Sequence, residues 1–429
     1  MKLNDVLYFS SVNFNGFQNC FWQETYDSTS KGGRFFIDIA RRLNPNRFIA
    51  RDNSEWTLPW PQEMIPKYCM VNYDPNFDQT FEQVSDAKAL EFKSRINKKN
   101  ERFAIMYSGG IDSTVIMTAL LKNLNKEELK NITVCTSVPA IVENPQFWRK
   151  YIWEKFQVID SMTHKYHNLI EKGFTPVTAD EGDSIYGTVF GLNLYHNWES
   201  LVGTKLSSAS RNHITNIMPK FSDPDIHYSE FKDLLIAYMS YPANQKFPIV
   251  GVETPDPNFG RRLYDKFARN AETASVPINS LHDFFWWLIF NVKLLNCGIR
   301  GALYYNDQIA PKQAIHTIEN WFLDPGYQHW SMVNNNNGEK IGHGAATYKK
   351  ASREYIWNFD RNDWYRLFKL KLESMAFNIV RQSINESTFA KPVARFGINK
   401  NYEFLDIRDQ SVKDYIQHHL FNYKIDWSE

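Results

Sequence analysis

The chain has 429 residues, enough for two or three domains and a sizeable hydrophobic core. Its 49 Lys and Arg residues are balanced by 48 Asp and Glu residues, which disfavours a strongly basic protein that coats nucleic acid but leaves room for a local basic patch. Aromatic residues make up 15% of the chain, a high share that deep cores, pockets and partner surfaces would each explain.

The N-terminal part of the chain is rich in aromatic residues, Asn, Gly and Pro and has no sustained helical period. Short strand-like runs at 6–9 and 34–39 are interrupted by turn signals, so we expect an irregular or β-rich region over residues 1–95. A polar, lysine-rich helix is expected at 85–97, across the end of this region. The first residues show no apolar signal segment, so we expect a cytoplasmic protein.

An alternation of strands and helices begins at Phe103. Strands are predicted at 103–107, 132–136 and 175–178, and helices at 113–124 and 145–156. This order is typical of a doubly wound α/β fold with a parallel, Rossmann-like sheet. The chain beyond residue 225 is expected to be largely helical. Its longest apolar run, at 284–295, is too short to span a bilayer, so we interpret it as a buried helix and expect no membrane partner.

The first predicted strand ends in a glycine-rich loop whose sequence is Ser-Gly-Gly-Ile-Asp-Ser, from Ser108 to Ser113. Gly109 and Gly110 can adopt positive φ and let backbone N–H groups approach an anion closely. Asp112 and Ser113 open the next helix, whose N-terminal amides favour phosphate oxygens. A carboxylate at Asp112 is a suitable ligand for Mg²⁺ beside a polyphosphate.

This loop lacks both the Walker A pattern and the dinucleotide fingerprint. It resembles the SGGxDS signature loop of the PP-loop ATP pyrophosphatases, which cleave ATP between the α and β phosphates. The resemblance implies an adenine-nucleotide α-hydrolase-like fold, with ATP-binding residues in the loop and along neighbouring strand ends. Those residues would be Met106, Ser108, Gly109, Gly110, Asp112, Ser113, Thr136 and Thr178.

A second segment follows the predicted strand at 175–178 and contains three carboxylates, at Asp180, Glu181 and Asp183. So many acidic groups at the end of a strand are costly unless a cation or a cationic substrate shares the site. The segment is similar to the TGEGADELFGG stretch of asparagine synthetases, with substitutions at Asp180, Glu181 and Ser184. The resemblance implies that Asp183 binds Mg²⁺ together with Asp112, and that Asp180 and Glu181 contact the substrate or orient its amine.

Further matches to the same family occur later in the chain, and each of them is weaker. The stretch from Tyr305 to Asp324 resembles the family's stretch that ends in ExRVPFLD, with two residues fewer between Glu319 and Asp324. Lys349 and Arg353 resemble a KxxLR helix start. The resemblance implies catalytic roles for Lys349 and for Lys369, which would stabilise negative charge during adenylation and amine attack. Lys369 could equally lie on the wet face of an amphipathic helix, and Lys371 is its nearest rival. A synthetase-like domain is therefore expected at 96–375, followed by a C-terminal arm or small α+β tail at 376–429.

We expect no complete counterpart of the glutaminase domain of glutamine-dependent asparagine synthetases. The position after the initiator methionine, where that domain carries its catalytic cysteine, is Lys2, and the segment before the loop is too short for the complete domain. We therefore expect no glutamine hydrolysis. The amine would come from free ammonia, from a substrate's own amino group or from a separate protein.

These observations favour an AMP-forming, ATP-dependent carbon–nitrogen ligase that uses Mg²⁺. It would adenylate a small-molecule or peptide carboxylate and transfer the acyl group to ammonia or an amine. A macrolactam-forming peptide cyclase is a variant of this hypothesis, and the aromatic excess would suit a peptide groove. Two other hypotheses remain open: a PP-loop enzyme that modifies a nucleobase or nucleotide, and a non-catalytic adenylate-binding partner protein.

Overall fold

The computed structural model describes residue 51 and residues 69–136, 138–153, 155–161, 166–187, 206–240, 259–294, 316–335 and 349–368. Several predicted features lie outside these residues: the strand-like runs at 6–9 and 34–39, the C-terminal arm at 376–429, Lys369 and Lys371. The chain divides into two compact units. One unit comprises residues 80–179, 305–321 and 345–429, and the other comprises 1–79, 180–304 and 322–344. The predicted domain boundaries stay predictions.

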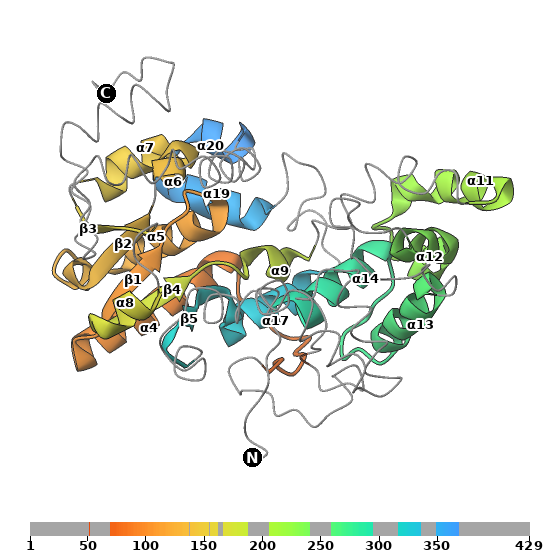
Figure 1. The fold of residues 1–429 in the computed structure, drawn as a ribbon, viewed down its shortest axis with the longest axis horizontal. Helices are drawn as coiled ribbons and strands as arrows, with labels where there is room; N and C mark the ends of the chain where they lie inside the picture. Colours follow the sequence, from red (N-terminus) through yellow and green to blue (C-terminus); the bar gives the residue numbers. More distant parts are fainter. Residues whose placement is uncertain are drawn as a thin grey trace, which may run out of the picture. The chain divides into compact units, whose positions relative to one another are not determined.

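The unit that begins at residue 80 is an α/β unit with a five-stranded, fully parallel sheet of order β3-β2-β1-β4-β5 (Figure 1). Its strands are β1 (Arg102–Met106), β2 (Ile132–Thr136), β3 (Gln157–Asp160), β4 (Phe174–Thr178) and β5 (Glu319–Asn320). Its helices and helical turns are α4 (Phe81–Lys99), α5 (Ile111–Asn123), η3 (Glu128–Asn131), α6 (Val138–Glu143), α7 (Pro145–Phe147), the π-helical turn η4 (Trp148–Ile152), α8 (Tyr166–Glu171), α19 (Lys350–Asp360) and α20 (Asp363–Phe368).

The described part of this unit confirms the predicted α/β class and its parallel sheet. The predicted strands at 103–107, 132–136 and 175–178 correspond to β1, β2 and β4, and the predicted helices at 85–97 and 113–124 correspond to α4 and α5. The helix predicted at 145–156 is too long, because helical structure ends at Ile152 and β3 begins at Gln157. β3 and β5, the two edge strands, were not predicted.

The central strand β1 is covered on both faces. Successive side chains of a strand point to opposite faces, so Phe103 and Ala104 face opposite ways. Phe103 stacks on Phe92 of α4 with ring centroids 4.3 Å apart, and Ala104 packs with Leu169 of α8. Both strand residues are fully buried. Burial on both faces explains why the strand sequence is a continuous apolar run, as parallel sheets require.

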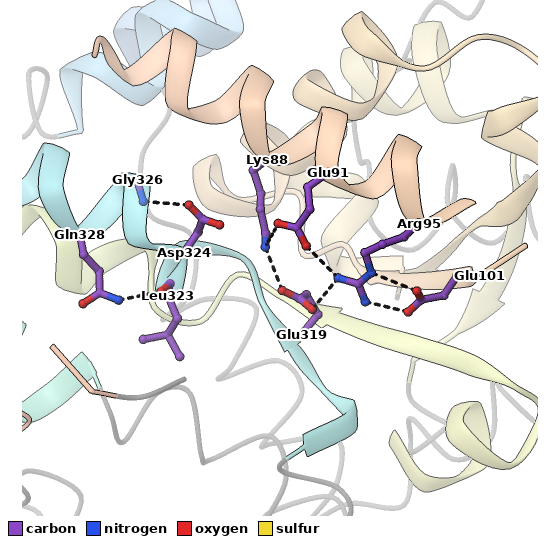
Figure 2. A network of polar contacts seen from close by, with 9 residues as sticks. All are labelled: Lys88, Glu91, Arg95, Glu101, Glu319, Leu323, Asp324, Gly326 and Gln328. Carbon is purple, nitrogen blue, oxygen red and sulfur yellow. Dashed lines mark hydrogen bonds and ion pairs between the residues drawn. The ribbon is translucent and has the colours of Figure 1, made fainter. Parts of the chain in front are cut away.

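An ion-pair network ties α4 to the edge strand β5 (Figure 2). The Lys88 ammonium of α4 donates to Glu319 Oε1 of β5 at 3.0 Å, and Arg95 donates to Glu319 Oε2 at 2.9 Å. Arg95 also forms a two-point contact with Glu101 at 2.7 and 3.0 Å. Glu319 belongs to the stretch that resembles ExRVPFLD, and its carboxylate holds a two-residue strand against a long helix.

The other unit is helical over its described residues. Its elements are α9 (Gly182–Tyr186), α11 (Ser208–Ile217), η5 (Met218–Lys220), η6 (Tyr228–Phe231), α12 (Lys232–Ser240), α13 (Phe259–Glu272), α14 (Leu281–Leu288), the π-helical turn η7 (Ile289–Lys293) and α17 (Pro325–Asn334), and η8 (Trp321–Leu323) runs across the boundary between the units. The buried helix expected at 284–295 is confirmed over α14 and η7. No helix in the described ranges is both long and apolar enough to cross a membrane.

Buried tryptophans account for part of the aromatic excess. Trp286 and Trp287 of α14 are fully buried, and each satisfies its indole N–H within its own unit. Trp286 donates to Ser331 Oγ at 3.0 Å, and Trp287 donates to Asn270 Oδ1 at 2.7 Å. Buried indoles with partners of this kind belong to a core rather than to an open pocket. Among the described residues, the large hydrophobic side chain that stands exposed is Leu90.

The Glu319 network generates a prediction about acid stability. Burial alone would raise the pKa of Glu319, but the charges and hydrogen bonds of Lys88 and Arg95 outweigh it and lower that pKa below its usual value. A carboxyl with a lowered folded-state pKa adds stability above its unfolded-state pKa, and this contribution disappears as pH falls through the folded-state pKa. Glu319→Gln should therefore reduce the free energy of unfolding by about 1–3 kcal/mol at neutral pH.

Urea denaturation at neutral pH and at a series of acidic pH values measures this effect. The wild type should lose more stability on acidification than Glu319→Gln, because the variant has already lost the titrating group. The control is Glu127→Gln, which removes a surface ion pair with Lys130. The Glu127 side chain is 74% exposed and the Lys130 side chain is 66% exposed. It should change stability by less than about 0.5 kcal/mol. Equal losses in the two variants would contradict the structural role of Glu319.

Candidate functional site

The Ser108–Ser113 loop lies at the point where the sheet order reverses. β1 pairs with β2 on one side and with β4 on the other, and the chain leaves β1 at its carboxyl end directly into the loop. In open parallel sheets, ligands bind outside the carboxyl ends of the strands at such a switch point. The loop that carries the predicted phosphate-binding residues therefore occupies the position where this class of fold binds ligands.

The backbone at Gly109 requires glycine. Its φ is +71°, in the left-handed region that disfavours side chains, and it is buried against α6. A Cβ atom at this position would lie inside contact distance of the Ala140 carbonyl oxygen and 2.8 Å from Glu143 Cβ. Gly110 differs, because its φ of −73° suits any residue. A Cβ there would lie 3.2 Å from Ser108 Oγ. Gly110 therefore leaves space for the Ser108 hydroxyl, but its own backbone conformation does not require glycine.

The two serines of the motif close the loop. The Ser108 N–H donates to Ser113 Oγ at 3.1 Å, and the two hydroxyl oxygens lie 3.1 Å apart. Ser113 Oγ in turn donates to the Gly110 carbonyl at 3.2 Å. These contacts hold the strand end and the first turn of α5 together.

Helix α5 presents its N-terminus to the loop. Gly110 is its N-cap, and the first backbone bond of the helix runs from the Thr114 N–H to the Gly110 carbonyl at 3.0 Å. The amides of the three preceding helical residues, 111–113, come before that first bond and have no acceptor inside the helix. Because Ser108 is exposed and Gly110 is partly exposed, an anion can reach this end of the helix from solvent.

Lys349 and Asp112 form an ion pair beside the loop. Lys349 donates from Nζ to Asp112 Oδ2, with side chains 5% and 21% exposed. Lys349 is the N-cap of α19 and has φ +57°, a left-handed conformation that costs free energy in a residue with a side chain. The structure thus brings together two predicted site residues separated by more than half of the chain. Lys349 was predicted as catalytic, and that role stays a prediction.

The ATP-binding residues predicted outside the loop lie at the carboxyl ends of three neighbouring strands. Met106 ends β1, Thr136 ends β2 and Thr178 ends β4. Thr136 and Thr178 are buried, whereas Met106 is partly buried. Within the described residues, Thr136 Oγ1 is a buried hydroxyl oxygen with no hydrogen-bond partner. Such a group is expected to find a partner in a complete complex.

The remaining predicted site residues belong to the other unit or lie outside the described residues. Asp180, Glu181 and Asp183 belong to the helical unit, where Glu181 is the N-cap of α9 and is fully buried. The magnesium site predicted for Asp112 and Asp183 stays a prediction, as do the substrate-binding roles of Asp180 and Glu181. Across the described ranges, no group of three or more His, Cys, Asp and Glu side chains is arranged to hold a metal ion. Lys369 lies outside the residues that the structure describes.

Sequence reasoning missed Tyr365, whose hydroxyl reaches the loop from α20. It donates to the Gly109 carbonyl at 3.2 Å and lies 3.2 Å from Thr114 Oγ1. The sequence gives no signal for this contact, because the tyrosine follows the loop by more than 250 residues. Arg353, which was matched to a KxxLR helix start, supports the same helix: it donates to the Arg366 carbonyl at 2.9 Å.

No protein-family model matches this chain, and neither the curated proteins nor the solved structures contain a significant match to it. The resemblance to the PP-loop family therefore stays a prediction from the loop motif and the acidic segment.

The conformation of Gly109 makes a sharp prediction about two adjacent glycines. Gly109→Ala places a side chain on a left-handed residue and against the Ala140 carbonyl, so it should lower the free energy of unfolding by about 2–4 kcal/mol. Gly110→Ala is the matched control, and it should cost less than about 1 kcal/mol. Urea denaturation of the purified variants measures both effects. Equal costs at the two positions would show that the loop path is not as described.

Proposed function

We propose that this protein is a PP-loop enzyme that cleaves ATP between the α and β phosphates and uses the energy to form an amide. The observation that carries the proposal is the SGGIDS loop, which lies at the carboxyl end of β1 at the switch point of a parallel sheet. Three features support phosphate binding there: the left-handed Gly109, the open N-terminus of α5 and the ammonium of Lys349.

The charges around the loop suit a polyphosphate once it is bound. Lys349 is paired with Asp112 of the first turn of α5, so its ammonium lies close to the α5 N-terminus. A phosphate at that N-terminus would offer Lys349 a second anionic partner. The Asp112 carboxylate is the oxygen ligand type that Mg²⁺ prefers, and bound Mg²⁺ would offset negative charge on pyrophosphate as it leaves.

The chemistry that this arrangement supports has two steps. In the first, a carboxylate oxygen of the substrate attacks the α-phosphorus, the bond to the bridging oxygen breaks, and pyrophosphate leaves with the electron pair. In the second, an amine attacks the acyl carbon of the resulting acyl-adenylate, loses a proton and expels AMP. The loop's part is to bind and orient the phosphates so that the substrate carboxylate is in line with the leaving pyrophosphate. Lys349 would stabilise the negative charge that develops on the leaving pyrophosphate.

The proposal predicts the products of ATP turnover. Incubation with Mg²⁺, ATP and panels of carboxylates, amines and nucleosides should release AMP and pyrophosphate in equal amounts, which ³¹P NMR resolves from ADP and phosphate. Turnover that requires a carboxylate and an amine would support amide formation, and turnover that requires a nucleoside would support base modification instead. ADP and phosphate as the sole products would refute cleavage between the α and β phosphates.

Two variants link the reaction to the loop. Asp112→Asn removes a charge at the first turn of α5 and should lower the rate of AMP release by roughly 10²-fold or more. Asp233→Asn is the control, because Asp233 is an exposed carboxylate in the first turn of α12. It should keep the wild-type rate. If both variants retain full activity, ATP cleavage takes place away from this loop.

A further inference from the structure

Tyr365 is a buried tyrosine whose hydroxyl contacts the backbone of the glycine loop. Its side chain is 1% exposed, and it is carried by α20, a short helix. The Arg353 guanidinium of α19 holds that helix by donating to the Tyr365 and Arg366 carbonyls at 3.3 and 2.9 Å. Arg353 of α19 thus anchors α20, and α20 in turn fixes the position of the Tyr365 hydroxyl.

The hydroxyl proton has two acceptors. Thr114 Oγ1 donates its own proton to the Gly110 carbonyl at 2.8 Å, so it can only accept from Tyr365. The Tyr365 proton is thus shared between Thr114 Oγ1 and the Gly109 carbonyl, each 3.2 Å away. Burial is the main cause that raises the pKa of Tyr365 well above its usual value, with nearby Tyr107, Glu143 and Asp112 adding to it. The hydroxyl therefore keeps its proton and remains a donor.

This contact sets the direction of one peptide plane. In a trans peptide the carbonyl and the following N–H point in opposite directions. Because the Gly109 carbonyl points inward to Tyr365, the Gly110 N–H points the other way. It donates to Ser108 Oγ at 3.3 Å on the exposed side of the loop. The reverse orientation would direct a carbonyl oxygen, with its partial negative charge, at an incoming phosphate.

We propose that Tyr365 is a positioning residue for phosphate binding. It holds the Gly109 carbonyl inside the protein, so that the Gly110 amide stays on the exposed side of the loop, where a phosphate oxygen can replace Ser108 Oγ as its acceptor. This inference depends on the proposed function, because it assigns the residue that prepares the same loop for phosphate. Tyr365 itself touches neither the phosphate nor the reacting atoms. Its effect passes entirely through the Gly109–Gly110 peptide.

The structure supplies a matched pair of variants. Tyr365→Phe removes the hydroxyl and keeps the ring that fills the core. Tyr355→Phe makes the same change at another buried tyrosine, whose hydroxyl donates to Asp86 Oδ1 of α4 at 2.7 Å. Both variants lose one buried hydroxyl, so both should lose some thermal stability, but only one loses a contact with the loop.

The experiment measures the binding of Mg-pyrophosphate and Mg-ATP to both variants by calorimetry. It also follows the Gly110 amide resonance in ¹⁵N-glycine-labelled protein during pyrophosphate titration. Tyr365→Phe should weaken pyrophosphate binding by about tenfold and reduce the ligand-induced shift of the Gly110 amide. Tyr355→Phe should bind pyrophosphate within about twofold of the wild type, because its lost hydroxyl contacts α4 rather than the loop.

The outcomes separate the two proposals. If the wild type binds neither ligand, the proposed function fails, and this inference fails with it. If the wild type binds and Tyr365→Phe binds equally well with an unchanged Gly110 shift, only the positioning role is overturned. Equal losses of affinity in Tyr365→Phe and Tyr355→Phe would also overturn it, because they would show a general effect of weakened packing. If Tyr365→Phe proves too unstable to assay, Gly110 amide exchange in wild-type protein decides: protection by pyrophosphate supports the role, and its absence refutes it.

Discussion

The conformation of the chain at Gly109 is the constraint on which the site depends. Its positive φ turns the chain from the end of β1 into α5, and its contact with the Ala140 carbonyl leaves no space for a side chain. The same residue gives its carbonyl to Tyr365, which fixes the direction of the following amide. One left-handed residue therefore determines both where the helix N-terminus lies and which groups of the loop face solvent.

The rest of the α/β unit keeps this turn in place. The two faces of β1 pack against α4 and α8, so the strand end that carries the loop is rigid. The ion pairs of Glu319 join α4 to the edge strand β5, which pairs with β4 on the far side of the switch point (Figure 2). A loop on a scaffold of this kind can hold charged groups in fixed positions. In a mobile segment, fixing the same groups would cost conformational entropy. Lys349, held in a left-handed conformation beside Asp112, is the clearest example.

The sequence predicted the parts of this arrangement that depend on neighbouring residues. β1 is a continuous apolar run because both of its faces are buried, and β2 and β4 are short segments rich in β-branched residues. The glycine loop is contiguous, so the strands and the loop could all be recognised locally. β3 is a short edge strand next to a helical turn, and β5 has two residues that become a strand only by pairing with β4. Tyr365 could not be predicted, because its role arises from a contact between segments more than 250 residues apart. Lys349 was found through the family resemblance alone, since its own sequence gives no sign that it pairs with Asp112.

The central claim is that ATP phosphates bind on the Gly109–Ser113 backbone. A crystal structure with Mg²⁺ and α,β-methylene-ATP, which cannot be cleaved between the α and β phosphates, tests it most directly. We expect phosphate oxygens within hydrogen-bond distance of the amides at the N-terminus of α5, with the Lys349 ammonium contacting a phosphate. A nucleotide bound elsewhere on the protein, with the loop and the Lys349–Asp112 pair unchanged, would contradict the account.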